Sequence, residues 1–149
     1  KITIAAAKIK LGIQEKLLLG NLGAKRDWGH AADYVRGMWL MLQQDIPSDY
    51  VLATGKTHTV KTFLNLTFKY AGLSVDKHVE IDQRLFRPHE VPLLLGDPSK
   101  ANKILNWYPR YGIKDLVQDM YRSDFSIQER HARGSFANIS PEAYTNNKI

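Results

Sequence analysis

Runs of apolar residues alternate along the chain between helical and strand-like spacings. The opening stretch, "KITIAAAKIKLGIQ", places Ile2, Ala5, Ile9 and Ile13 near helical spacing. It has no capping residue ahead of it, so we expect a helix cut in its first turn. The next stretch, "KLLLGNL", has the pattern of a short buried strand. Its closing glycine and asparagine can take turn conformations at little cost.

The stretch "HAADYVRGMWLMLQQD" predicts a second helix, ended by Pro47, with one apolar face. That face comprises Ala31, Tyr34, Val35, Met38, Trp39 and Leu42. We expect it in the core, because an aromatic residue on an amphipathic helix is usually packed inside; Trp28 is interpreted in the same way. "DYVLATG" predicts a second buried strand.

A third helix is predicted for "HTVKTFLNLTFKYAGL", with Thr57 or Thr59 as its N-cap and Gly72 as its stop. Val79 and Ile81 alternate as in a strand. "GDPSKANKILN" then predicts a helix with inward-facing apolar residues. Its capping and core positions are Asp97 as N-cap, Pro98 at the first helical position, and Ala101, Ile104 and Leu105 facing inward.

A turn between Pro109 and Gly112 precedes a closing helix. Its leading apolar residues are Ile113, Leu116, Val117 and Met120. From His131 the apolar period is lost, so we expect residues 131–149 to form a flexible tail. Residues 1–130 are predicted to form one α/β domain with two or three short parallel strands separated by helices.

Composition narrows the possible functions. The 149 residues are 44% hydrophobic and 24% charged, as in a soluble globular domain. The chain has no cysteine and no apolar run of the roughly 20 residues that span a bilayer, so no membrane association is expected and the cytoplasm is the default location. The net charge is +6, but the basic residues form no dense patch, which argues against nucleic-acid binding.

Catalytic and metal-binding motifs are missing from the sequence. The five histidines have no metal-ligand spacing, and there is no GxSxG, HExxH or Walker loop. No catalytic residue is therefore predicted in this chain. Two arginine-bearing turns, "KRDWGHA" and "LFRPHE", instead follow predicted strands.

Arg26 and Arg87 in these turns suit pyrophosphate recognition, because a guanidinium donates paired hydrogen bonds to phosphate oxygens. Strand exits are also where open α/β sheets bind ligands. The alternative is that both arginines pair on the surface with carboxylates such as Asp27, Asp33 or Glu90, which would contribute little.

Three stretches together resemble the C-terminal half of the GDP-mannose 4,6-dehydratase family, within the extended short-chain dehydrogenase/reductases. They are "LGNLGAKRDWGHAADYVRGMWLMLQQD", "YVLATGKTHTVKTF" and "RLFRPHEVPLLLGDPSKANKILNWYPR". The resemblance covers residues 1–125 in order. It implies the small substrate-binding portion of such an enzyme, with few short strands and flanking helices.

The family converts GDP-mannose to GDP-4-keto-6-deoxymannose with bound NADP. Its GxxGxxG loop and YxxxK pair belong to the N-terminal Rossmann half, and neither motif is found here. The resemblance therefore implies a chain that is inactive by itself. Its partners would be GDP-mannose, the missing nucleotide-binding half and, when complete, further copies in a homo-oligomer.

By motif, the resemblance implies seven substrate-binding residues: Lys1, Leu19, Gly20, Asn21, Arg26, Arg87 and Glu90. Lys1, Arg26 and Arg87 would neutralise the diphosphate, and Glu90 would accept hydrogen bonds from ribose or guanine. The segment 19–21 would form the wall beside the guanosine, with a glycine that permits close backbone approach. Asp27 or His30 would brace the turn after Arg26.

Two hypotheses remain. In the first, the chain is the substrate-binding part of a dehydratase and exposes an apolar surface around Ile2, Ile4, Ile9 and the early strands, where the missing half would pack. In the second, it stands alone as a sugar-nucleotide-binding or structural remnant, and that surface is polar or self-paired.

Overall fold

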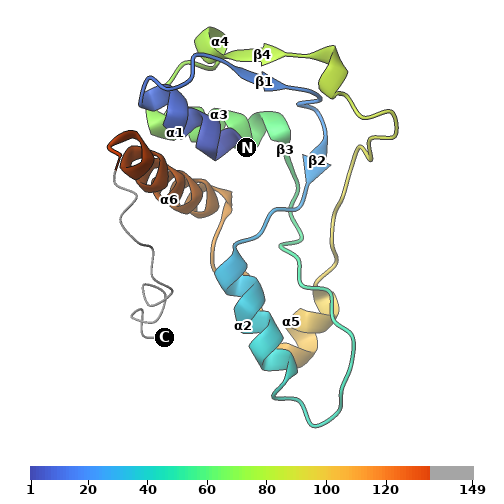
Figure 1. The fold of residues 1–149 in the computed structure, drawn as a ribbon. Helices are drawn as coiled ribbons and strands as arrows, with labels where there is room; N and C mark the ends of the chain where they lie inside the picture. The colour runs from blue at the N-terminus through green and yellow to red at the C-terminus, as the bar shows by residue number, and fades with distance from the viewer. Residues whose placement is uncertain (135–149) are drawn as a thin grey trace.

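The computed structural model describes residues 1–134, which form a small α/β domain of helices and very short strands. Figure 1 shows an upper part built around β1, β4, α1 and α3, and a lower part built around α2 and α5, with α6 beneath the upper part. The elements in chain order are α1 (Ile2–Lys10), β1 (Leu17–Leu19), β2 (Lys25–Arg26), α2 (Ala31–Met41), β3 (His58–Thr59), α3 (Val60–Ala71), α4 (Val75–His78), β4 (Val79–Ile81), the 3-10 helix η1 (Gln83–Leu85), α5 (Ser99–Leu105) and α6 (Ile113–Ala132).

The upper part holds the main core. β1 pairs in parallel with β4, so that Leu17 lies opposite Val79. α1 packs against both α3 and α6. The buried residues between these elements are Ala5, Ala6, Ala7, Ile9, Leu17, Leu19, Leu64, Phe68, Ala71 and Tyr121. The three small alanines of α1 let its backbone come close to its neighbours.

The ends of α3 agree with the sequence prediction. Of the two candidate caps, Thr59 is the N-cap, and its hydroxyl accepts the backbone N–H of Thr62 at 3.0 Å. Gly72 ends the helix in the left-handed conformation, with φ +67°. The predicted start of α5 is wrong by one residue, because Pro98 is the N-cap and Ser99 begins the helix; the Asp97 carboxylate accepts the N–H of Ser99 at 2.9 Å.

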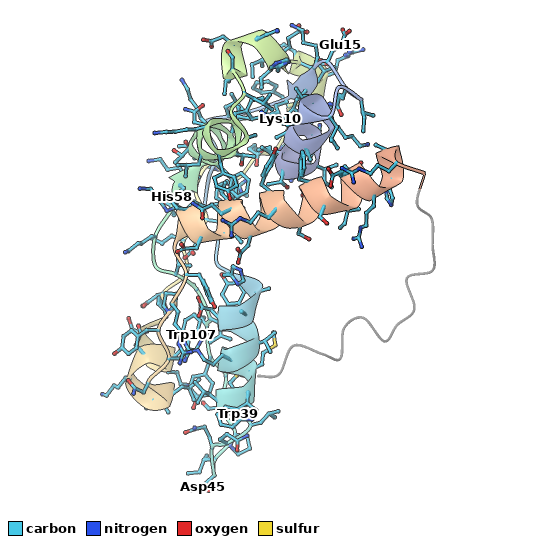
Figure 2. All side chains as sticks on the ribbon, turned by 90° about the vertical axis from the view of Figure 1, so that its left-hand side faces the viewer. Lys10, Glu15, Trp39, Asp45, His58 and Trp107 are labelled. Carbon is cyan, nitrogen blue, oxygen red and sulfur yellow. The ribbon has the colours of Figure 1, made fainter. Side chains whose placement is uncertain are left out.

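The lower part is organised around Trp107, which is fully buried between α5 and α2 (Figure 2). Its indole N–H donates to the carbonyl of Asp33 at 2.8 Å. The Asp33 carboxylate is itself buried and accepts the N–H groups of Arg110 and Tyr111 at 2.9 and 3.1 Å. A buried polar group therefore joins α2 to the turn before α6.

The prediction that the apolar face of α2 lies in the core is wrong. Trp39 is 59% exposed and Leu42 is 82% exposed, and Val35 and Met38 are exposed as well. The buried positions of the helix are Asp33 and Gly37. A Cβ added at Gly37 would lie 2.6 Å from the Leu52 side chain and 3.1 Å from the indole nitrogen of Trp107, so the glycine allows close packing here. Trp39, which was expected in the core, therefore lies on the exposed side of the helix.

The strand predicted for "DYVLATG" is not formed either. Residues 49–55 pair with no strand in the described part of the chain. The two remaining strands, β2 and β3, pair antiparallel, with Lys25 opposite Thr59, which the sequence analysis did not predict. Ile104 and Met120, which were predicted to face inward, are exposed, whereas Ala101, Leu105, Leu116 and Val117 are buried as expected.

The expected tail at residues 131–149 begins inside a helix, because α6 continues to Ala132. Residues 135–149 lie outside the described residues. Within residues 1–134, no helix combines the length and the apolar composition that a membrane-spanning helix requires.

Candidate functional site

A cavity of about 270 Å³ opens where the chain leaves β1 and β2. Its walls come from the end of β1, from β2, from the start of α3 and from the segment after η1. The lining residues are Leu19, Gly20, Asn21, Ala24, Arg26, Trp28, Val60, Leu85, Arg87 and Glu90. Six of the seven residues predicted to bind substrate therefore share one cavity. We call it the β1–β2 cavity.

Lys1 is the seventh predicted residue, and it does not line the β1–β2 cavity. It is exposed and precedes α1, at the point marked N in Figure 1. Its backbone carbonyl accepts the N–H of Ala5 at 3.0 Å, which starts the helix. The structure thus assigns Lys1 a place at the start of α1 rather than in the lining of this cavity.

Arg26 is held by the protein itself. Its guanidinium forms an ion pair with the Glu90 carboxylate, and both side chains are only about one fifth exposed. It also donates to the carbonyls of Lys25 and Val91, each at 2.8 Å. These contacts tie β2 to the segment that carries Glu90. Arg26 therefore pairs with a carboxylate, Glu90, as the alternative interpretation proposed, but the pair is partly buried and not on the exposed surface.

Arg87 carries the unpaired positive charge of the β1–β2 cavity. Its side chain is exposed and takes part in no ion pair or hydrogen bond with residues 1–134. Because Glu90 offsets the charge of Arg26, Arg87 leaves the lining with an excess of one positive charge. An anionic ligand would meet this guanidinium without first breaking an internal contact.

Asp27 and His30 both brace the turn after β2, as the sequence predicted. The Asp27 carboxylate accepts the backbone N–H groups of Thr54 and Gly55, each at 3.0 Å, and that of Gly96 at 3.4 Å. His30 is the N-cap of α2, and its Nδ1 accepts the N–H of Ala32 at 3.2 Å. Asp27 thereby ties two segments distant in sequence, residues 54–55 and Gly96, to the exit of β2.

The sequence analysis did not assign Trp28 to the site. Its ring packs against Phe63 with centroids 5.1 Å apart, in agreement with a core role, but the side chain also lines the β1–β2 cavity. The signal was present in the spacing: Trp28 stands two residues after Arg26, and side chains two apart in an extended chain share a face. Ala24, two residues before Arg26, has the same spacing, whereas Val60 and Leu85 carry no comparable signal.

Tyr34 has a packing role, as expected from its sequence context. Burial raises the pKa of Tyr34, and the nearby charge of Asp27 raises it further. The phenol therefore stays protonated at neutral pH. Its ring is stacked with Trp107 at a centroid distance of 6.3 Å. Among residues 1–134, no group of three or more His, Cys, Asp or Glu side chains could hold a metal ion.

Comparison with known proteins decides the family. The family described as GDP-mannose 4,6 dehydratase matches residues 1–120. This chain belongs to the GDP-mannose 4,6-dehydratase family. GDP-mannose 4,6 dehydratase 1 of Arabidopsis thaliana is 55% identical over 130 residues, covering 87% of this chain and 36% of the relative. The enzyme of Sinorhizobium fredii is 49% identical, covering 85% and 41%.

The chain therefore spans about two fifths of these dehydratases. The structure of RMD from Pseudomonas aeruginosa complexed with NADPH has a TM-score of 0.76 and 18% identity, with 85% of this chain and 41% of that chain covered. A dTDP-glucose 4,6-dehydratase from Bacillus anthracis in complex with NAD has a TM-score of 0.71 and 16% identity, covering 88% and 40%. At these identities the likeness shows the fold.

Both of those structures contain a nicotinamide cofactor, which occupies a dinucleotide site. Such a site needs a strand that runs through a glycine-rich turn into a helix. Within residues 1–134, β1 leads through Gly20 to β2, β3 runs directly into α3, and β4 leads to η1. These residues do not fit a dinucleotide, and we derive no hydride-transfer step from them.

Proposed function

We propose that this chain is the GDP-mannose-binding part of a GDP-mannose 4,6-dehydratase, which converts GDP-mannose to GDP-4-keto-6-deoxymannose with NADP. The observation that supports the proposal is the β1–β2 cavity, which contains six residues matched to the family motif. Those residues come from segments more than 60 positions apart, such as Arg26 and Glu90. Because these segments are distant in the sequence, only the fold brings the residues to one cavity.

In this proposal Arg87 is the first contact of the diphosphate, because its charge has no partner within the described chain. Arg26 contributes a guanidinium that is oriented by two backbone carbonyls and by Glu90, which also offsets its charge. Glu90 keeps oxygen lone pairs for ribose or guanine hydrogen bonds. Asn21 supplies a polar side chain and Trp28 an aromatic surface to the same wall.

The rest of the enzyme would supply the cofactor and the reacting groups. The exposed apolar side chains of α2 and the unpaired segment 49–55 are the surface on which we place it. Such a surface is larger than single scattered apolar residues and is typical of an interface. It differs from the position expected from sequence, because Ile9 is buried and Ile2 packs against the core, although Ile4 remains exposed.

The exposed apolar side of α2 favours this proposal over a stand-alone binding protein or structural remnant. A chain that functions alone would be expected to cover Trp39 and Leu42 or to carry polar residues there.

Calorimetric titration with GDP tests the binding site. Removal of an unpaired charge in Arg87→Ala is expected to weaken GDP binding about tenfold, or about 1.4 kcal/mol, since a charge-assisted contact to phosphate is lost. Arg84→Ala is the matched control, because Arg84 is nearby in sequence, pairs with Asp82 and does not line the cavity. Equal GDP affinity in Arg87→Ala and Arg84→Ala would remove the β1–β2 cavity from the proposal.

A further inference from the structure

A second cavity, of about 250 Å³, shares Trp28 with the β1–β2 cavity as a lining residue. It is formed between the turn at residues 54–58 and the turn that leads into α6. Figure 2 shows His58 near the start of α6. The lining residues are Trp28, Thr54, Lys56, His58, Pro109, Arg110, Tyr111, Gly112 and Ile113. We call it the Lys56–Arg110 cavity.

Both walls of this cavity are held by carboxylates that bind backbone N–H groups. Asp27 accepts the N–H groups of Thr54 and Gly55, which lie directly before Lys56. The buried Asp33 accepts the N–H groups of Arg110 and Tyr111 on the opposite wall. The carboxylates are thus engaged by backbone groups, and the turns that carry the basic side chains are fixed in place.

The lining of the cavity contains basic side chains and no carboxylate. Lys56, His58 and Arg110 contribute them, and within residues 1–134 none of these three side chains forms an ion pair or a hydrogen bond. Two carboxylates in the first half of α6 have other partners: Asp115 accepts the N–H of Gly112 at 2.8 Å, and Asp119 lies 3.2 Å from His30. Two permanent positive charges therefore border the cavity without an internal counter-ion.

We propose that the Lys56–Arg110 cavity binds a phosphate group, as a site separate from the β1–β2 cavity. Lysine and arginine together provide a point charge and a planar pair of donors, which is the donor set that phosphate oxygens accept. The three basic side chains converge on one small cavity and suit a single phosphate group, so the ligand that we propose is inorganic phosphate or a small phosphate monoester.

The aromatic side chains of the cavity should bind a phosphate monoester and inorganic phosphate with different affinities. Trp28 and Tyr111 both line the cavity, and the Tyr111 ring is kept in place by stacking on His30 at a centroid distance of 4.4 Å. An aromatic phosphate ester would gain contact with these rings, whereas inorganic phosphate would not. Tighter binding of phenyl phosphate than of inorganic phosphate would therefore identify a monoester as the ligand, and equal binding would identify free phosphate.

Backbone amide NMR of the whole chain, at constant ionic strength, tests the proposal. Added inorganic phosphate is expected to shift the amide signals of residues 54–58 and 110–113 in a saturable manner. The double variant Lys56→Gln, Arg110→Gln should weaken this binding at least about tenfold, because two charge-assisted contacts are lost. Both side chains are exposed, so the variant should keep the wild-type signals elsewhere in the spectrum.

Two further variants separate this site from the nucleotide site. Arg87→Ala should leave the phosphate-induced shifts unchanged, whether or not it weakens GDP binding. Lys103→Gln, an exposed lysine on α5 that lines neither cavity, should also leave them unchanged. Absence of saturable shifts, shifts that persist in the double variant, or an equal loss in Arg87→Ala or Lys103→Gln would each overturn the proposal.

Discussion

Gly20 follows β1 and lies close to the backbone of η1 at Leu85. A Cβ added at Gly20 would lie 2.5 Å from the carbonyl oxygen of Leu85. The sequence analysis assigned this glycine to the approach of a ligand, but the close approach in the structure is to the protein's own backbone. Both residues line the β1–β2 cavity, so this contact helps to set the distance between two of its walls.

Gly20→Ala is therefore expected to lower the free energy of unfolding by about 1–3 kcal/mol, because a backbone carbonyl must move to admit the methyl group. Urea denaturation followed by circular dichroism measures the change. Gly112→Ala is the control: an added Cβ there would lie 3.6 Å from the nearest atom, and a loss of less than about 1 kcal/mol is expected. Equal losses in the two variants would show that steric contact with Leu85 is not the cause.

Asp33 is a buried acidic residue whose role is structural. The side chain is 1% exposed, and its carboxylate oxygen Oδ2 accepts two backbone N–H groups before α6. Its other oxygen lies 3.8 Å from the guanidinium of Arg36. Without the carboxylate, the N–H groups of Arg110 and Tyr111 would be left without these partners, which is costly inside a protein.

Asp33→Ala is accordingly expected to lower the free energy of unfolding by about 3 kcal/mol or more. Thermal and urea denaturation provide the measurement, and Asp45→Ala, an exposed residue beyond the end of α2, is the control. A loss below about 1 kcal/mol in Asp33→Ala would contradict the assigned role.

At the scale of elements, α2 has two faces of opposite character. Trp107 packs against the face marked by Asp33 and Gly37, while Trp39 and Leu42 lie on exposed surface. Figure 2 shows Trp107 between α5 and α2, and Trp39 near the far end of α2. The more apolar face of the helix is thus not the one that the described chain buries.

The double variant Trp39→Gln, Leu42→Gln should therefore change the free energy of unfolding of this chain by no more than about 0.5 kcal/mol, since exposed positions contribute little. Phe68→Ala, at a fully buried position of α3, should cost about 3–5 kcal/mol. Urea denaturation of both variants compares them directly. A loss above about 2 kcal/mol in the double variant would show that these side chains are packed inside the chain in solution.

At the scale of the whole molecule, residues 1–134 contain a candidate substrate cavity, and none of their strands runs through a glycine-rich turn into a helix. Incubation with GDP-mannose and NADP is expected to yield no GDP-4-keto-6-deoxymannose, because the described residues provide no position for a hydride carrier. Mass spectrometry of the nucleotide sugars gives the measurement, and full-length GDP-mannose 4,6 dehydratase 1 of Arabidopsis thaliana serves as the positive control. Product formed by this chain alone would refute the proposed division of roles.

Local features of the fold could be read from the sequence, because they depend on neighbouring residues. The Thr59 cap and the Gly72 stop of α3 are contacts within one turn. The strands β1 and β4 and the helix α6 follow from apolar periods over a few residues. The family motifs also identified Arg26, Arg87 and Glu90 as residues of one site, and these three do line one cavity.

Tertiary structure alone decided which surfaces are buried and which charges are paired. A periodic pattern marks the apolar side of α2, but burial depends on where Trp107 lies, a residue 70 or so positions further along. Segment 49–55 has a strand pattern, yet a strand needs a neighbour for its hydrogen bonds, and the described chain provides none. Likewise, Glu90 pairs with Arg26 and leaves Arg87 unpaired because the fold brings the first two together across 64 positions, a contact that no local pattern encodes.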